Sequence, residues 1–236
     1  MNERHRQKRL TALRYVLALP RSVWYNLRLL PLRQAVRLPL LVSHRTRVEN
    51  LGGKVVLDTP ALKTGLVEIG FTTCQCSDFR YDRTRLNIRG QVIVKGKCTF
   101  GAGSSVEVGE NGILTLGDRF HLGPKSLLIC HKEINFGYHS RVSWCSTIMD
   151  TDQHRLVDSQ GECRNADRPV TVGDNVWIGC HAIIPKGVTL ASDTTVGAGA
   201  VLRGHYDEEM TVLAGNPAVV VRRGVKRETA AAVNNL

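Results

Sequence analysis

The chain has 236 residues, of which 42% are hydrophobic and 22% charged, values close to those of ordinary soluble proteins with a sizeable buried core. Its net charge of +11 is concentrated in residues 1–47, which contain eleven Lys or Arg and one acid but no motif that reads DNA or RNA, so nucleic-acid binding is not expected. The seven cysteines form no CxxC pair and follow no secretory signal, which predicts free thiols in a cytoplasmic protein.

Residues 1–50 form a basic arm with the composition of an amphipathic helix. Apolar residues recur there at helical spacing, at Val23, Trp24, Leu27 and Leu30. Pro20 and Pro31 bracket this stretch and Ser22 is available as an N-cap, so a short helix is predicted between the two prolines. Arginines interrupt the apolar runs, so the arm is too polar to span a bilayer. It either lies on an anionic inner-membrane surface or packs its leucines on the rest of the protein.

From residue 51 to residue 224 the sequence consists of short, Gly-punctuated and β-branched stretches with a six-residue period. The longest run of aliphatic residues at this spacing is Val172, Ile178, Ile184, Leu190, Val196 and Leu202. A period of six is too short for a helical repeat and too regular for a sandwich, so each hexad is predicted to supply one short strand and one corner of a triangular coil. Stacked coils would give an all-β domain, a β-helix with a continuous apolar core.

The six-residue ladder is interrupted between Ile148 and Val170. The intervening stretch begins with the polar sequence DTDQH at positions 150–154 and ends at Pro169. Long loops on a rigid scaffold are frequently functional, because the scaffold fixes their two ends. We therefore predict an active-site loop at about residues 150–169, and a C-terminal tail at residues 225–236.

Three strings of this sequence resemble a known family, the hexapeptide-repeat acyltransferases. They are VTVGDNVWIG at 170–179, CHAIIPKGVTLASDTTVGAGAVL at 180–202 and AGNPAVVVR at 214–222. Within that family the chain is similar to maltose and galactoside O-acetyltransferases and to capsular-polysaccharide O-acetyltransferases, over residues 65–224. The resemblance implies a left-handed parallel β-helix, a homotrimer, and acetyl-CoA as co-substrate in a groove between neighbouring β-helices.

The resemblance also points to His154, because similar acetyltransferases carry a catalytic His just before such a loop. A sugar hydroxyl needs a base to attack at neutral pH, whereas the thioester of acetyl-CoA is already activated. We therefore predict that His154 is the general base and that the reaction needs no metal. Asp152 or Asp150 would hold its other ring nitrogen, since alternation in an extended segment places both on the side of His154.

Further positions are assigned to the acyl-CoA groove by the same resemblance. Trp177 matches a Trp beside the groove, although a Trp covering one coil edge is equally consistent with the pattern. The residues expected to let the pantetheine arm approach the backbone are Gly197, Ala198 and Gly199. The cations expected to meet the CoA phosphates are Lys186, Arg222 and Arg223.

The acceptor side of the site is less constrained by the sequence. His131 and Trp144 are the candidate acceptor-binding residues, against the plain alternative of surface side chains. The expected activity is acetyl transfer from acetyl-CoA to a hydroxyl of a sugar or polysaccharide precursor. Two alternatives stay open, transfer to an amine of a nucleotide-sugar or similar acceptor, and a β-helix that serves as a non-catalytic scaffold.

Overall fold

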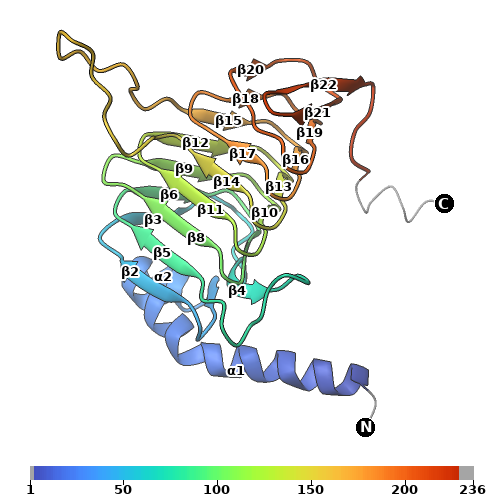
Figure 1. Ribbon diagram of the computed structural model, residues 1–236. Helices are drawn as coiled ribbons and strands as arrows, with labels where there is room; N and C mark the ends of the chain where they lie inside the picture. Colours follow the sequence, from blue (N-terminus) through green and yellow to red (C-terminus); the bar gives the residue numbers. More distant parts are fainter. Residues whose placement is uncertain (1–2, 229–236) are drawn as a thin grey trace.

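The computed structural model describes residues 3–228, with side chains from residue 12 onward. Within these residues the chain forms helices α1 (Glu3–Leu29) and α2 (Leu32–Ala35), followed by three sheets that wind around a common axis. Figure 1 shows the two helices at the N-terminal end of the coil. Residues 229–236 of the predicted C-terminal tail lie outside the described part.

The three sheets are called A, B and C in the order in which the chain visits them. Sheet A contains β1 (Leu40–Val42), β4 (Val67–Thr72), β7 (Cys98–Gly101), β10 (Phe120–Leu122), β13 (Arg141–Val142), β16 (Trp177–Ile178), β19 (Thr195–Val196), β21 (Thr211–Gly215) and β22 (Ala218–Arg223). Sheet B contains β2 (Arg47–Asn50), β5 (Arg85–Ile88), β8 (Ser105–Val108), β11 (Leu127–Cys130), β14 (Thr147–Met149) and β17 (Ile183–Ile184). Sheet C contains β3 (Lys54–Leu57), β6 (Gln91–Val94), β9 (Ile113–Leu116), β12 (Glu133–Phe136), β15 (Val170–Val172), β18 (Thr189–Leu190) and β20 (His205–Tyr206).

Neighbouring strands within each sheet pair in parallel up to β21, and β22 folds back antiparallel to β21. From β1 to β18 each coil thus contributes one strand to every sheet, as the hexapeptide period predicts. The fold class predicted from the sequence, a left-handed parallel β-helix, is confirmed.

The aliphatic ladder forms the core of the coil. All six residues of the longest run, from Val172 to Leu202, are at most 2% exposed. They stack in register with their equivalents in neighbouring coils, as Leu128, Ile148 and Ile184 do in sheet B. Burying one such side chain contributes about 1.5–3 kcal/mol, so the repeat is the main source of stability.

One corner of the triangular coil positions the predicted active-site loop. This corner, called the B–C edge, consists of the turns that join sheet B to sheet C, at residues 51–53, 89–90, 109–112, 131–132, 150–169 and 185–188. Its backbone is tightly stacked: a Cβ added at Gly90 would lie 2.2 Å from the carbonyl oxygen of Gly109 and 2.3 Å from that of Gly112. Glycine is therefore required at position 90 by close approach of the next coil.

Helix α1 docks on strand β1 through two polar side chains. Ser22 Oγ donates to the carbonyl of Ala18 and accepts the amide of Val42, at 2.9 Å each. Asn26 Nδ2 donates to the carbonyl of Leu40 at 2.7 Å, and the amide of Leu40 donates to Asn26 Oδ1 at 3.1 Å. The predicted helix boundary and cap were wrong: α1 begins at Glu3, runs through Pro20, and uses Ser22 to bind the sheet.

The opposite face of α1 is apolar and exposed. Leu13, Val16, Leu17, Val23, Trp24 and Leu27 are between 39% and 60% exposed. Tyr25 and Leu30, on the docked side, belong to the hydrophobic core. Among the described residues no helix is long and apolar enough to cross a membrane.

Candidate active site

The loop at residues 150–169 leaves strand β14 and returns at β15, on the B–C edge (gold, upper left in Figure 1). Asp150, at its start, is completely buried. Its carboxylate accepts the backbone amides of His131, Lys132 and Glu133 at 2.7, 2.8 and 2.7 Å. Asp150 therefore fastens the start of the loop to the preceding coil, and both of its oxygens are engaged with the backbone.

Asp152 makes a second anchor, within the loop itself. Its Oδ2 accepts hydrogen bonds from Lys186 Nζ at 2.6 Å and from Asn165 Nδ2 at 2.8 Å. Asn165 Nδ2 also donates to the carbonyl of His154 at 2.8 Å. The hydrogen bond from Lys186 holds the pKa of Asp152 below its usual range. These contacts tie the two arms of the loop together around the backbone of His154.

Lys186, predicted from the sequence to meet a CoA phosphate, binds the loop in this structure. Its side chain is 9% exposed and, besides Asp152, its Nζ donates to the carbonyl of Asn165. In this arrangement the ammonium group connects the two arms of the loop. Asn165 itself was missed, because an Asn in a polar loop gives no signal until the two arms are seen side by side.

His154 and His131 line one cavity of about 280 Å³ on the B–C edge. Its other lining residues are Thr151, Gln153, Arg155, Cys163, Asn165, Ala166 and Asp167. His154 is exposed, and across residues 3–228 neither Asp150 nor Asp152 is hydrogen-bonded to its ring. His131 Nε2 lies 3.0 Å from Oε1 of Glu107. The structure thus brings the predicted base and one predicted acceptor residue together, in a cavity lined mostly by polar groups.

Glu107 was not singled out by the sequence. It lies on β8, one coil before His131, and its carboxylate is the hydrogen-bond partner of the His131 ring. A carboxylate in this position selects the ring tautomer and orientation of His131. The residues are 24 positions apart, so only the stacking of coils reveals the pair.

The remaining predicted site residues lie on another side of the coil. Trp177 is on strand β16 of sheet A, 42% exposed, and its Nε1 donates to Ser143 Oγ at 3.0 Å. Trp144 is 38% exposed on the turn from β13 to β14, the edge between sheets A and B. The structure therefore groups Trp144 with Trp177 and not with His131.

The small residues and cations predicted to meet acyl-CoA also lie on the sheet A side. Gly197 to Gly199 follow strand β19, and the left-handed backbone of Gly199, with φ +71°, has open space around it. Arg222 and Arg223 are exposed on β22, and Arg223 Nε is paired with Glu208 at 2.9 Å. In one chain these groups do not converge with His154, which is on the B–C edge.

Sequence comparison finds similarity to one protein family and to several individual proteins. Residues 169–204 match the family described as "Bacterial transferase hexapeptide (six repeats)". The chain is 26% identical to the "Uncharacterized 24.8 kDa protein in cps region" of Klebsiella pneumoniae, over 84% of this chain and 85% of that protein.

Several relatives have names that state an activity, among them two from Escherichia coli (strain K12). The chain is 27% identical to the galactoside O-acetyltransferase of Escherichia coli (strain K12), over 52% of this chain and 56% of the relative. It is 34% identical to the protein of the same strain named "Putative colanic acid biosynthesis acetyltransferase WcaF", over 52% of this chain and 66% of the relative. The chain thus spans between about half and two thirds of the length of these two relatives.

Proposed function

We propose that this hexapeptide-repeat acyltransferase transfers an acetyl group from acetyl-CoA to a hydroxyl of a sugar or polysaccharide precursor. The observation that carries the proposal is the cavity lined by both His154 and His131, beside a loop anchored by Asp150 and Asp152. The names of the relatives, which refer to galactoside and colanic acid, support a carbohydrate acceptor.

In the proposed reaction His154 removes the proton of the acceptor hydroxyl as its oxygen attacks. The acceptor oxygen bonds to the carbonyl carbon of the thioester, the carbon–sulfur bond breaks, and the CoA thiolate takes the proton from the imidazolium. General-base catalysis of this kind contributes about 10²–10⁴-fold to the rate. His131, oriented by Glu107, would bind the acceptor beside the reacting hydroxyl.

Asp152 and Lys186 serve as positioning residues in this proposal. They act through Asn165, whose amide binds both Asp152 and the carbonyl of His154. Preorganisation of a base by surrounding contacts matters because small displacements from reactive geometry are costly in rate. Lys186→Met should therefore lower kcat through a looser loop, while the Km for acetyl-CoA stays close to that of the wild type.

The site is completed in the proposal by a second copy of the chain. His154 on the B–C edge and the Trp177 group on sheet A are separated within one chain. A homotrimer would place the B–C edge of one β-helix against sheet A of the next, with acetyl-CoA between them. Arg222 and Arg223, exposed on β22, remain the candidates for the CoA phosphates.

The first experiment measures acetyl-CoA turnover by release of free thiol across a panel of sugars, glycan fragments and amines. The parent is compared with His154→Ala and with His205→Ala, which removes an exposed His on β20. We expect hydroxyl-dependent turnover that falls by about 10²–10⁴-fold in His154→Ala and is unchanged in the control. Turnover with amines but not alcohols would replace the proposal by N-acetyl transfer, and absence of CoA binding would favour a scaffold.

Mixing experiments test the shared site. His154→Ala and Trp177→Ala should each be weakly active, whereas trimers reassembled from both should regain part of the activity, because some interfaces then contain two intact halves. Light scattering of the parent should give the mass of three chains. A monomeric parent with full activity would contradict the shared site.

The exposed apolar face of α1 is proposed to rest on an anionic membrane surface. An amphipathic helix of this kind lies in the interface, with its apolar side chains buried among the lipids. The test is co-sedimentation with vesicles of phosphatidylglycerol and phosphatidylcholine, comparing Leu17→Glu/Trp24→Glu with Val219→Glu/Val221→Glu, an equal change on exposed β22. Only the first pair should lose pelleting. Equal pelleting of both would show that α1 does not carry the contact.

A further inference from the structure

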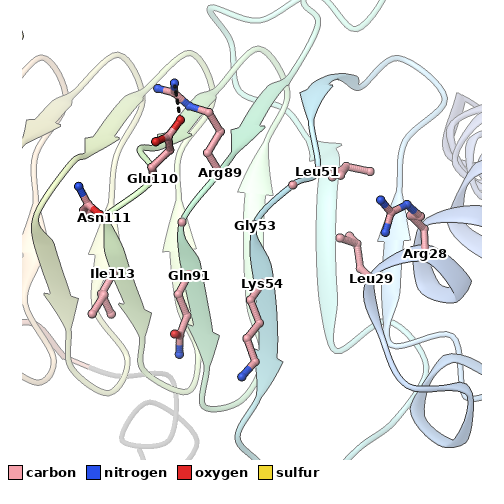
Figure 2. Close-up of a pocket in the computed structure, with 13 residues that line it drawn as sticks. Arg28, Leu29, Leu51, Gly53, Lys54, Arg89, Gln91, Glu110, Asn111 and Ile113 are labelled. Carbon is pink, nitrogen blue, oxygen red and sulfur yellow. Dashed lines mark ion pairs between the residues drawn. The ribbon is translucent and has the colours of Figure 1, made fainter.

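A second cavity, of about 530 Å³, lies between the C-terminal end of α1 and the first turns of the B–C edge. Figure 2 shows Arg28 of α1 on one side of it, with Lys54, Arg89 and Glu110 contributed by successive coils. This cavity is separate from the cavity of His154, and no sequence pattern indicated it. It is formed only when α1 is seated on the coil.

The polar groups of this cavity suit an acidic carbohydrate. Three cations, Arg28, Lys54 and Arg89, and one carboxylate, Glu110, line the cavity, and Glu110 Oε1 lies 3.9 Å from Arg89 Nη1. A net positive charge therefore remains, carried by side chains from three separate elements. Among the described lining residues the planar amides of Gln91 and Asn111 add hydrogen-bond donors and acceptors of the kind that bind hydroxyl groups. Guanidinium groups bind carboxylates and phosphates with particular strength.

Polar contacts connect this cavity with the cavity of His154. Besides its pairing with Glu110, Arg89 reaches Glu107 with Nη2 at 3.6 Å from Oε1. The same Glu107 oxygen lies 3.0 Å from His131 Nε2, and His131 shares its cavity with His154. The two cavities are thus joined by a line of charged and polar side chains along one edge of the coil.

The spacing of the coils gives the length of this line. Successive parallel strands are about 4.8 Å apart, and the turn at 89–90 is two coils before the turn at 131–132, so the separation is about 10 Å. The loop of His154 begins one coil further. Arg28 and Lys54 lie beside the turn at 51–53, four coils before that loop and therefore about 19 Å from it. A single sugar bound at His154 would not reach them, whereas a short oligosaccharide lying along the edge would.

We propose that the B–C edge is an acceptor track, and that the cavity at Arg28, Lys54 and Arg89 is a distal subsite for a negatively charged unit of a glycan chain. The inference rests on the proposed acetyl transfer, because it assigns to that reaction an extended acidic acceptor. The distal subsite holds the chain by its charge while a hydroxyl several units away meets His154. The negative charge is a carboxylate within the chain or a phosphate at its end.

The test measures binding first, without acetyl-CoA. The probes are fluorescein-labelled oligosialic acid, oligogalacturonic acid, a neutral glucose oligomer of equal length, and that oligomer with one terminal phosphate. Fluorescence polarisation compares the parent with Arg28→Gln/Lys54→Gln and with Lys95→Gln/Lys97→Gln. The latter pair removes the same charge from exposed lysines on the turn between β6 and β7.

We expect the parent to bind at least one acidic probe more tightly than the neutral oligomer, with an affinity that falls with salt. The Arg28/Lys54 double variant should lose about tenfold in affinity, which corresponds to about 1.4 kcal/mol of binding free energy at the subsite. The affinity of the control pair should stay within twofold of the parent. Equal loss in both pairs, or no preference of the parent for any acidic probe, would overturn the proposal. Unfolding midpoints of both variants confirm that each is folded.

Turnover then separates this inference from the proposed reaction. With an acceptor that is turned over, the Arg28/Lys54 variant should raise Km for long acidic chains, with unchanged kcat and unchanged use of a monosaccharide. Binding that depends on Arg28 and Lys54 in a protein without transferase activity would keep the subsite and remove the proposed function. If the protein is fully active on long acidic chains and the Arg28/Lys54 variant is unaffected, the proposed function is kept and the distal subsite is removed.

Discussion

Replacement of Asp150 by Asn should lower the free energy of unfolding. This loss of stability distinguishes a structural role of Asp150 from a catalytic one. The buried carboxylate accepts three backbone amides, one with Oδ1 and two with Oδ2. Asn keeps the size of the side chain but has a single acceptor oxygen, so its NH₂ group would face at least one amide donor. An unsatisfied buried donor costs about 1–3 kcal/mol, and the remaining bonds lose their charge assistance. We expect a total loss of about 3–5 kcal/mol.

The measurement is urea unfolding followed by circular dichroism, at equal protein concentrations because assembly contributes to apparent stability. Asp152→Asn is the matched control. The side chain of Asp152 is 42% exposed, so loss of its ion pair with Lys186 should cost less than about 1 kcal/mol. An Asp150→Asn protein as stable as the parent would refute the reasoning. Loss of activity without loss of stability in that protein would place Asp150 beside the ring of His154.

Three further predictions concern the coil itself. Gly90→Ala should lower the free energy of unfolding by more than about 3 kcal/mol, because its Cβ would meet two carbonyl oxygens. Gly161→Ala, at φ +78° with open space around it, should lower it by about 1 kcal/mol. Denaturant midpoints of the two variants test this, and equal losses would contradict the packing argument. Burial, assisted by the charge of Arg141, lowers the pKa of His121 to about 4. Between pH 4 and 6.5 the unfolded state therefore binds a proton that the folded state does not. The free energy of unfolding should decline by about 2–3 kcal/mol as pH falls through that window. Stability measured from pH 7 to 4 should decline less in His121→Gln, and identical profiles would exclude His121 as the cause. Burial raises the pKa of Cys98 to about 12, so a thiol reagent should modify it only in urea, and rapid native labelling found by mass spectrometry would contradict its burial.

Much of the fold was predictable because its signal is local and repeated. A six-residue period fixes which side chains point inward whatever the rest of the chain does, and the ladder from Val172 to Leu202 is buried throughout. The interruption of the same period located the loop that carries His154. The strings between Val170 and Arg222 that resemble the hexapeptide-repeat acyltransferases indicated the transferase class, because a resemblance between sequences is recognised without coordinates.

The boundaries of α1 were not predictable from the arm alone. Pro20 and Pro31 suggested two ends, and Ser22 a cap, because these are the local preferences of the residues. The structure instead uses Ser22 and Asn26 to bind the backbone of β1, 14 to 20 residues further along the chain. Tertiary contacts of this kind override local preferences, because leaving a buried hydrogen-bonding group unpaired costs more free energy than losing a helix cap.

The sequence by itself determined the coil, its apolar interior, the position of the loop and the choice of His154 as the candidate base. Only the tertiary structure distinguished Asp150 from Asp152, because alternation along the chain places both on the side of His154. Stacking of the coils lets Asp150 alone accept three backbone amides from the preceding coil. The same stacking brought Lys186 to Asp152 and Glu107 to His131. Pairs of this kind arise between coils whose turns differ in length, so their distance along the chain carries no period that a sequence could display.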